Sequence, residues 1–440
     1  MTMHTRWTIC AAAALLSAPF FVSSEAPFEA ALAQGLGAPA TAKSHPQWVA
    51  QARVRRVAPK NVRRAPTPPP VATAQPQLPP RVPFTAAEDA VSIIPGIPDA
   101  RFWADSETDF NNALPPQPGP WLILSSGGED GAFGAGLLTG LTAAGKRPDY
   151  AVVTGVSTGA LMAPFAFAAQ RYDDALRRVY TKVSAADVFE AGRTGESFAD
   201  SWPLGDLIAK EITPALMADI AAEHRRGRRF FVVSTDLDAE RSVVWNMGAI
   251  AAHGGEDALK LFRRVLLASA SIPGAFPPVL IDVEANGKRF AEMHVDGGVG
   301  GQFFVAPSAL MASTSDYRLP ATQLYIVVNT GLEPDFKVVD RFAPAILAQS
   351  VGAAVKVDTR MMLDRTYILA KRSGVEFNVA TMPASFNAPS KGAFDPDYMG
   401  ALFQTGYEQG RSATPFSTQP PPYPRWPVPP PSHIEKTGAN

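Results

Sequence analysis

A serine, an aspartate and a run of glycines are the residues of this chain whose types and spacing are best suited to chemistry. Ser157 stands at the centre of Gly155-Val156-Ser157-Thr158-Gly159, a G-x-S-x-G pentapeptide. Where such a pentapeptide joins a strand to a helix, the turn is sharp and exposes the serine hydroxyl. Side chains at 155 or 159 would collide across this corner, which explains the two glycines. Ser157 at the helix N-terminus is therefore predicted to be the nucleophile of an acyl-transfer reaction.

The base that Ser157 needs is predicted to be a carboxylate. The triad of an α/β-hydrolase runs serine, acid, histidine along the chain, but the only histidine after Asp296 is His433, in a Pro-rich C-terminal segment. Asp296 follows a predicted strand, and Gly297 and Gly298 let the backbone turn there. We expect Asp296 to take the proton of Ser157 directly, in a partly dry site, because an ordinary aspartate of pKa ~3.9 is a weak base. The alternative is an ordinary turn aspartate.

A glycine-rich loop supplies the third element. It runs from Ser125 to Gly131 and contains Gly127, Gly128 and Glu129. Such a loop between a buried strand and a helix points several backbone N–H groups in one direction, where they can hold a phosphate or the oxyanion of an acyl-transfer intermediate. The spacing lacks both G-x-x-x-x-G-K-[ST] and a G-x-G-x-x-G directly after the strand, so nucleotide binding is the weaker interpretation.

The elements that must position these residues alternate between strand and helix. Short apolar runs predict strands at 121–124, 151–154, 230–234 and 324–329, with 242–246 as a possible partner of 230–234, and a further strand is expected at 289–295, before Asp296. Helical patterns cover 133–141, 158–171, 204–224, 256–270 and 343–370. The run at 121–124 lacks polar alternation, which is typical of a strand buried on both faces. The pattern therefore predicts a three-layer α/β/α sandwich with a largely parallel central sheet.

These three motifs, in this order, resemble the patatin-like phospholipase family. The glycine-rich loop, the G-x-S-x-G serine and the aspartate of D-G-[GA] match Gly127, Gly128 and Gly131, then Ser157, then Asp296. Leu267 to Val279 also looks like the family's segment before the aspartate, and the resemblance spans about 120–410. It implies a Ser-Asp dyad that hydrolyses acyl esters of lipids through an acyl-enzyme, as a lipase or phospholipase A does.

Two alternatives to a hydrolase stay open. The same dyad and acyl-enzyme could transfer the acyl group to an alcohol other than water. A catalytically weak or inactive protein with this fold could instead serve as a binding or interaction protein of the cell envelope. Against this second alternative, the chain carries a candidate nucleophile, base and oxyanion loop together.

The loop departs from the family's usual D-G-G-G-x-R-G in a way that bears on the substrate. Ser125 and Ser126 replace the first two residues, and Asp130 stands in place of the arginine. Losing a guanidinium and gaining Glu129 and Asp130 should make the entrance less favourable to an anion. We expect neutral or zwitterionic esters to be preferred over anionic phospholipids. The alternative is that the two acids only complement the dipole of the following helix.

Smaller features have weaker interpretations. His294 lies two residues before Asp296 on the same predicted strand and face, so it could tune the dyad, although packing in the sheet is the simpler interpretation. Phe189, Phe198 and Trp202 lie in a loop-like stretch that could form a lid over lipid, or simply pack beneath a long loop.

Composition excludes several functions. The chain has 440 residues, 46% of them hydrophobic, which is enough for a sizeable core, and its one cysteine excludes a disulfide framework. None of the six histidines pairs at the i, i+4 spacing of a helical metal site, so we expect no metal or cofactor. Residues 34–87 hold eight bases and no acid, whereas 88–440 hold 31 bases and 39 acids. An acidic body is unusual for a nucleic-acid enzyme, so we expect no nucleic-acid partner.

The ends of the chain predict an exported protein. Residues 1–33 read as a signal peptide, or less simply as an uncleaved anchor, which indicates the periplasm, the cell envelope or secretion. Residues 34–87 are a basic Pro-rich linker and 411–440 a Pro-rich tail, both expected to be disordered. The linker is either a spacer or a contact with a membrane or anionic envelope. Between them we expect an extension at 88–117 and the catalytic domain at 118–410.

Overall fold

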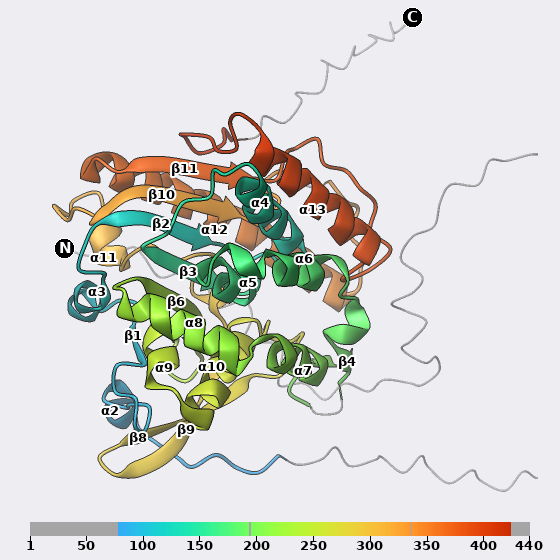
Figure 1. Ribbon diagram of the computed structural model, residues 1–440. Helices are drawn as coiled ribbons and strands as arrows, with labels where there is room; N and C mark the ends of the chain where they lie inside the picture. The colour runs from blue at the N-terminus through green and yellow to red at the C-terminus, as the bar shows by residue number, and fades with distance from the viewer. Residues whose placement is uncertain (1–77, 193–194, 335, 424–440) are drawn as a thin grey trace, which may run out of the picture. The chain divides into compact units, whose positions relative to one another are not determined.

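The computed structural model describes residues 78–192, 195–334 and 336–423, and its centre is a nine-stranded sheet (Figure 1). The strands are β1 (Arg101–Trp103), β2 (Gly119–Leu124), β3 (Val152–Val156), β6 (Arg229–Asp236), β7 (Arg241–Asn246), β8 (Val279–Ala285), β9 (Lys288–Asp296), β10 (Ala321–Val328) and β11 (Glu376–Thr381). The main order is β1-β7-β6-β3-β2-β10-β11, and β9 pairs with β6 and β8. A separate hairpin joins β4 (Glu190–Ala191) and β5 (Ala199–Asp200).

Five neighbouring strands of the sheet are parallel. β11, β10, β2, β3 and β6 run in one direction, and β7, β9, β8 and β1 extend the sheet with antiparallel pairs. The predicted α/β class and largely parallel sheet are therefore confirmed. Because the ends of parallel strands meet at one edge, the segments that follow β2, β3 and β10 gather at the same edge of the sheet.

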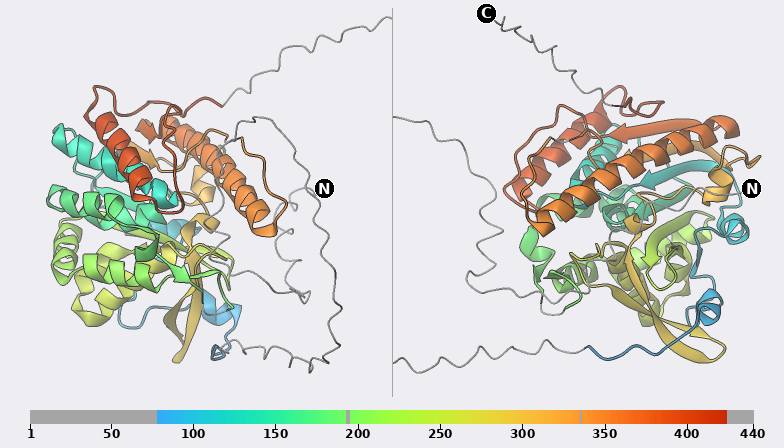
Figure 2. Two further views of the ribbon diagram at one scale, coloured as in Figure 1. Left: turned by 90° about the vertical axis from the view of Figure 1, so that its right-hand side faces the viewer. Right: turned by 180° about the vertical axis from the view of Figure 1, so that it is seen from behind.

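Helices cover both faces of the sheet. They are α2 (Ala86–Ala90), α3 (Glu107–Ala113), α4 (Gly131–Ala143), α5 (Thr158–Phe167), α6 (Asp173–Thr181), α7 (Trp202–Glu211), α8 (Pro214–Arg225), α9 (Met247–His253), α10 (Gly255–Ser269), α11 (Ser308–Met311), α12 (Ala343–Ser373) and α13 (Pro396–Arg411). Helix α12 lies on one side of the sheet, and α4 and α13 lie on the other (Figure 2). None of the helices in the described residues is both long and apolar enough to cross a bilayer.

Side chains of the central strand β2 alternate between two hydrophobic cores, one on each face of the sheet. Leu122 and Leu124 of β2 face the core beneath α4, α5 and α10, whereas Trp121 and Ile123 face the core beneath α12. All four side chains are buried. The unbroken apolar run therefore reflects a strand covered on both faces, as the sequence predicted.

Helices α4 and α13 approach each other so closely that their backbones touch. A Cβ added at Gly136 would lie 2.0 Å from the carbonyl oxygen of Phe403, and one at Gly406 would lie 2.1 Å from that of Phe133. Glycine on both helices is therefore a steric requirement of this contact. Helix α4 follows the glycine-rich loop, so α13 supports that loop from the far end of the chain.

Several predicted boundaries differ from the structure; the helix expected at 158–171, for instance, ends at Phe167. The single helix expected at 204–224 is two helices, because Thr213 caps a new helix that begins at Pro214. The folded unit also begins inside the predicted linker: Arg81 forms an ion pair with Asp238, and Phe84 stacks on Phe290. The other predicted limits, 1–33 for the signal and 34 for the start of the linker, lie outside the described residues.

The folded unit also continues past the predicted start of the tail. Ser417 exchanges two backbone hydrogen bonds with Val379, each 2.8 Å long, and the ring of Phe416 lies edge-on to Tyr325. The expected disorder therefore does not begin at 411. The sequence did not predict these contacts, because each is made by a single residue of a proline-rich segment and not by a periodic pattern.

Candidate active site

Ser157 occupies the sharp turn between β3 and α5. Its backbone has φ 55° and ψ −123°, a conformation that costs a non-glycine residue roughly 1–3 kcal/mol and persists only where surrounding structure holds it. A Cβ added at Gly155 would lie 2.5 Å from the Gly159 carbonyl oxygen, and one at Gly159 would lie 2.4 Å from that of Leu124. The predicted steric need for both glycines agrees with this geometry.

The end of helix α10 fixes both members of the candidate dyad. The Ser157 amide donates to the hydroxyl of Ser269 at 3.1 Å, and that hydroxyl donates to the Val233 carbonyl at 2.7 Å. The Asp296 amide donates to the carbonyl oxygen of Ser271 at 2.9 Å. In the sequence, residues 267–279 are notable only because they resemble the family's segment before the aspartate. The serines within it gave no separate signal of this positioning role.

Asp296 is buried at the end of β9, beside Ser157. Its Oδ1 accepts from the Gly298 amide at 2.7 Å. Its Oδ2 is buried and makes no hydrogen bond of normal geometry to any described residue. Burial raises the pKa of Asp296 to about 6, while the Ser157 side chain and the Gly298 amide act to lower it. No cation of the described residues lowers this pKa, so the carboxyl faces the serine in the dry site that a carboxylate base needs. Gly297 packs against the Val233 carbonyl, from which an added Cβ would lie only 2.3 Å.

The glycine-rich loop is tied to the segment that follows Asp296. The Ser126 amide donates to the Gln302 carbonyl at 2.8 Å, and the Ser126 hydroxyl donates to the side-chain oxygen of Gln302. The Gln302 amide group in turn donates to the carbonyl of Gly298 at 2.8 Å. Gln302 thus links the loop to the base, a role that no motif in the sequence indicated.

Asn329 at the end of β10 fixes the other side of the loop. Its backbone amide donates to the Ser125 hydroxyl, and its side-chain amide donates to the Ser125 carbonyl, both at 2.9 Å. Gly127 has φ 156°, and a Cβ there would lie 2.7 Å from that of Asn329. The two serines that depart from the family pattern therefore anchor the loop to its neighbours.

The residues predicted to form the oxyanion loop take different positions. Gly128, with φ 56°, lines the pocket together with Ser157. Gly131 begins α4, and a Cβ there would lie 2.1 Å from the Thr158 hydroxyl, so its small size permits close packing of α4 on α5. The Glu129 carboxylate accepts from the Phe394 amide. Backbone donation to an oxyanion by this loop stays a prediction.

The two loop acids bind the segment that leads into α13. Besides the contact of Glu129 with Phe394, the Tyr398 hydroxyl donates to Asp130 Oδ1 at 2.6 Å. Burial raises the pKa of Asp130 to about 6, against the opposing effects of Tyr398 and the more distant Lys356. Asp130 precedes α4 but makes no side-chain hydrogen bond that caps it. The acids therefore fasten the loop to the C-terminal part of the fold, a role that the helix-dipole interpretation did not include.

An apolar pocket opens from Ser157. Its empty volume is about 810 Å³, part of it open to solvent. Leu161, Phe165, Leu204 and Phe276 are among the side chains that line it, and Glu211 is the one charged residue in the described lining. Phe189 packs edge-to-face on Phe394 and tilted against Phe276, as the packing interpretation expected, whereas Phe198 and Trp202 are exposed. Such a pocket can hold an alkyl chain with its carbonyl group at the serine.

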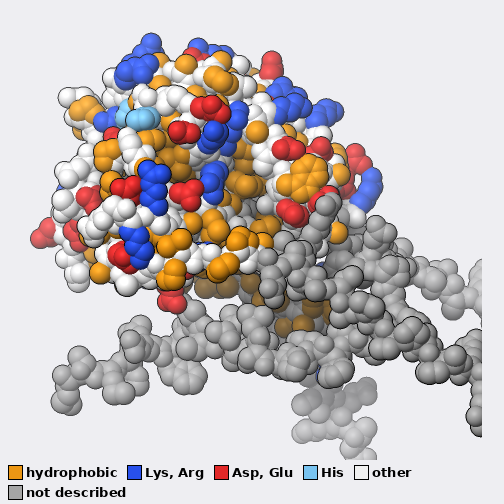
Figure 3. All heavy atoms as spheres, turned by 90° about the horizontal axis from the view of Figure 1, so that it is seen from below, with side chains coloured by type: hydrophobic (Ala, Val, Ile, Leu, Met, Phe, Trp, Pro, Cys, Tyr) orange, Lys and Arg blue, Asp and Glu red, His pale blue; other side chains and the backbone are white. Residues whose placement is uncertain are grey.

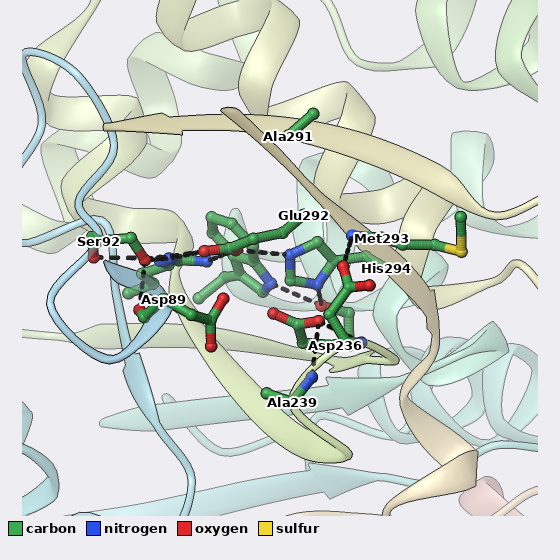
Figure 4. A network of polar contacts seen from close by, with 12 residues as sticks. Asp89, Ser92, Asp236, Ala239, Ala291, Glu292, Met293 and His294 are labelled. Atoms are coloured by element: carbon green, nitrogen blue, oxygen red, sulfur yellow. Dashed lines mark hydrogen bonds and ion pairs between the residues drawn. The ribbon is translucent and has the colours of Figure 1, made fainter. Parts of the chain in front are cut away.

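His294 belongs to a second buried group of polar side chains (Figure 4). Its Nδ1 lies 3.0 Å from the Ser234 hydroxyl and its Nε2 lies 3.1 Å from Glu292 Oε2. Arg101 binds both oxygens of Glu292, and the Ser92 hydroxyl donates to the same carboxylate at 2.8 Å. None of these hydrogen-bond partners of His294 is Ser157 or Asp296. The structure therefore places His294 in the sheet's own network, and a tuning role stays a prediction.

This network also contains the described group most suited to hold a metal. Asp236, Glu292 and His294 offer three ligand atoms that lie within 4.8 Å of one another, and Asp236 Oδ2 is buried without a partner. Arg101 already neutralises Glu292 through both carboxylate oxygens. A cation here would have to displace that guanidinium or lie against it, so the charges favour the arginine-bound arrangement.

Comparison with known proteins agrees with the site. Residues 122–307, which contain Ser157, Asp296 and the glycine-rich loop, match the family described as patatin-like phospholipase. The chain contains a patatin-like phospholipase domain. This family consists of serine acyl hydrolases that act on lipids. Asn329, α12 and α13 lie beyond the matched residues, although Asn329 and α13 hold the loop of the patatin-like domain in place.

Other comparisons add little. The chain is structurally similar to VipD from Legionella pneumophila, with a TM-score of 0.36 and 11% sequence identity, over 68% of this chain and 66% of VipD. A likeness of this degree says nothing further about the patatin-like site. Among curated proteins, none matches the chain.

Proposed function

We propose that this protein is a serine acyl hydrolase that cleaves carboxylic esters of lipids. The observation that carries the proposal is the pairing of Ser157, held in a strained turn at the apolar pocket, with a buried and cation-free Asp296 whose pKa is raised to about 6. At neutral pH such a carboxyl is mostly ionised and is a better base than an ordinary aspartate.

In the first half of the reaction, the Ser157 oxygen attacks the ester carbonyl carbon and its proton passes to Asp296. Amides of the glycine-rich loop and of the start of α5 stabilise the oxyanion. The intermediate collapses, the alcohol leaves with the proton from Asp296, and the acyl group stays on Ser157. Water then attacks the acyl-enzyme and gives its proton to Asp296. The acid leaves as Ser157 recovers that proton.

Neutral or zwitterionic esters are the proposed substrates. Glu211 in the described pocket lining is paired with Arg178, so the support lies in the loop, which carries Glu129 and Asp130 where an arginine is usual. An anionic head group near the loop would meet these two acids and not a guanidinium. A clear preference for phosphatidylglycerol over a neutral ester of equal chain length would contradict this part of the proposal.

Fluorophosphonate labelling of the full chain, combined with hydrolysis of short and long acyl esters, tests the proposal. We expect Ser157→Ala to abolish both signals. Ser412→Ala is the control: it also removes a hydroxyl, which in the described part of the chain donates to the Gln409 carbonyl alone, and it should leave both signals unchanged. A folded wild-type protein that neither labels nor hydrolyses any ester would instead support the binding-protein alternative.

Export to the periplasm, the cell envelope or the medium is also part of the proposal, on the strength of residues 1–33 alone. So is contact of the basic segment at 34–87 with an anionic envelope, for which the unbalanced charge is the support.

A further inference from the structure

Helix α12 changes character along its length. Its C-terminal half packs on the sheet, with Leu363, Thr366 and Leu369 buried, but no residue before Thr359 is buried. The first 13 residues of the helix, 343–355, contain no charged side chain, whereas the next ten contain five. A helix that is exposed to water normally carries charge on its outer face. An exposed and uncharged half therefore indicates a surface that meets something other than water.

The exposed half carries large apolar side chains on more than one side. They continue from the preceding loop into the helix: Phe336, Val338, Phe342, Ile346, Leu347 and Val351. Lys337 and Arg341 stand among them, and α12 begins at Ala343. We call residues 336–351, with these side chains, the apolar tip. On the face shown in Figure 3, by contrast, acidic and basic side chains of the described residues are interspersed with apolar ones, as on an ordinary solvated surface.

Topology places the apolar tip at the edge of the sheet that holds the active site. Because α12 follows β10 and runs back along the sheet, its N-terminal half lies beyond the ends of β2, β3 and β10, where Ser157 and the glycine-rich loop also lie (Figure 2). Sixteen residues precede Thr359 in the helix, a length of about 24 Å at 1.5 Å per residue. The tip therefore projects from the edge at which a substrate must arrive.

The middle of α12 contacts the site itself. Burial raises the pKa of Asp358 while the backbone amide of Gln302 acts to lower it, and a Cβ added at Gly301 would lie 3.5 Å from the Met362 sulfur. Gln302 is the residue that ties the glycine-rich loop to the segment after Asp296. The helix that carries the apolar tip thus lies against the segment that joins Asp296 to the glycine-rich loop.

We propose that the apolar tip is a docking element that inserts into the surface of a lipid bilayer and holds it against the pocket of Ser157. The inference rests on the proposed function, because a lipid ester reaches this pocket from an assembled lipid surface. Apolar side chains with a few flanking bases are the composition of segments that lie in the membrane interface. The uncharged stretch of 13 residues is too short to span a bilayer, so the contact is a shallow insertion.

Helix α12 supplies its own matched control. Ile346 is 51% exposed in the apolar tip, and Ile368 is 50% exposed on the half that packs on the sheet. Glutamate at either position therefore places the same change on the same helix at the same exposure. Vesicles of phosphatidylcholine, alone and mixed with phosphatidylglycerol, are the probe, and binding is followed by flotation of the full chain carrying Ser157→Ala.

We expect the Ser157→Ala chain to float with both kinds of vesicle. Ile346→Glu should weaken binding about tenfold or more, the effect of withholding one isoleucine side chain from an apolar environment. Ile368→Glu should change it by less than about twofold, as for a surface substitution outside the contact. Absence of vesicle binding, or equal losses in the two variants, would overturn the proposal. So would self-association of the chain that Ile346→Glu abolishes while vesicle binding is unchanged, because the tip would then join two copies.

A soluble short-chain ester separates this inference from the proposed function. In the chain with an intact Ser157, Ile346→Glu should lower hydrolysis of vesicle phosphatidylcholine while leaving turnover of the soluble ester unchanged. If the wild-type chain hydrolyses no ester yet floats with vesicles through the tip, the proposed function fails and the docking surface stands. If it hydrolyses the soluble ester but does not bind vesicles, the proposed function stands and the docking surface fails.

Discussion

Glu292 and Asp296 are two buried acids four residues apart on one strand, yet their carboxyl groups behave in opposite ways. Burial would raise the pKa of Glu292, but hydrogen bonds and charge from Arg101 and His294 overcome it and lower the pKa to about 2. Burial raises the pKa of Asp296 to about 6, because only the Ser157 hydroxyl and one backbone amide oppose it. The difference is the cationic partner and not the depth of burial.

The comparison separates a structural acid from a chemical one. The ion pair of Glu292 is satisfied and binds β9 to β1 and to the segment around Ser92, so it has no capacity left to accept a proton at neutral pH. Asp296, by contrast, lies beside Ser157, and its Oδ2 makes no hydrogen bond of normal geometry to any described residue. An unpaired carboxyl in a dry site is energetically unfavourable, and such positions concentrate at active sites.

Removing the proton acceptor should have the largest effect. Asp296→Asn keeps the side-chain size and the oxygen that accepts from Gly298, but it cannot take a proton from Ser157. We expect kcat on a soluble ester to fall about 10²–10⁴-fold, with the thermal midpoint unchanged or higher because a poorly solvated charge is removed. A variant with near wild-type kcat would mean that Asp296 is only a turn residue.

Breaking the ion pair should be the next largest effect, and it should act on stability. Arg101→Met leaves Glu292 buried without its cation, which typically costs about 3–5 kcal/mol in the free energy of unfolding. Chemical denaturation would measure this loss. The double variant Arg101→Met, Glu292→Leu should recover much of it, since both charges are then gone. Equal losses in the single and double variants would show that packing of the arginine, and not its charge, supports β9.

The pH dependence of activity should report the same contrast. Asp296 must be ionised to act as a base, so kcat/KM for a soluble ester should fall as pH decreases through about 6. Glu292 titrates near pH 2, so it contributes nothing to this limb. A limb near pH 4 would indicate that the base is solvated, contrary to the buried position of Asp296.

The smallest expected effect concerns Asp236, the neighbour of Glu292 that Arg101 does not reach. Burial raises the pKa of Asp236 from 3.8 to about 7, with the charges of Glu292 and Asp89 adding to the rise. The folded state therefore binds this proton more tightly than the unfolded state, and the stability that it contributes is lost as pH rises from about 4 to about 7. Asp236→Asn should gain on the order of 1 kcal/mol relative to wild type between pH 5 and pH 8.

Thermal unfolding of both chains at the two pH values measures that gain. The wild-type curve should still fall with pH, because burial also raises the pKa values of Asp89 and Asp130 to about 6. An identical difference between the chains at both pH values would show that Asp236 is ionised throughout.

The sequence predicted what local patterns encode. Apolar runs located β2, β3, β6 and β10, and β7 and β9 were expected as further strands. The glycines at 155 and 159 are required by sterics that any tight strand-to-helix turn imposes. It did not predict Ser269, Gln302 or Asn329, because each acts through hydrogen bonds to a residue more than a hundred positions away. The ion pair of Arg101 with Glu292 was not predicted for the same reason: no sequence spacing relates a base at 101 to an acid at 292.

The contact between α4 and α13 makes the order of synthesis matter for the patatin-like domain. The nascent chain has produced the nucleophile by residue 157 and the base by residue 296, but the helix that buttresses the glycine-rich loop ends at Arg411. Until that last helix emerges from the ribosome, the glycines of α4 present bare backbone to water. A chain released early would hold the reactive groups of an acyl hydrolase without the support that orients its oxyanion loop. Synthesis of α13 is thus a late step in assembling this active site.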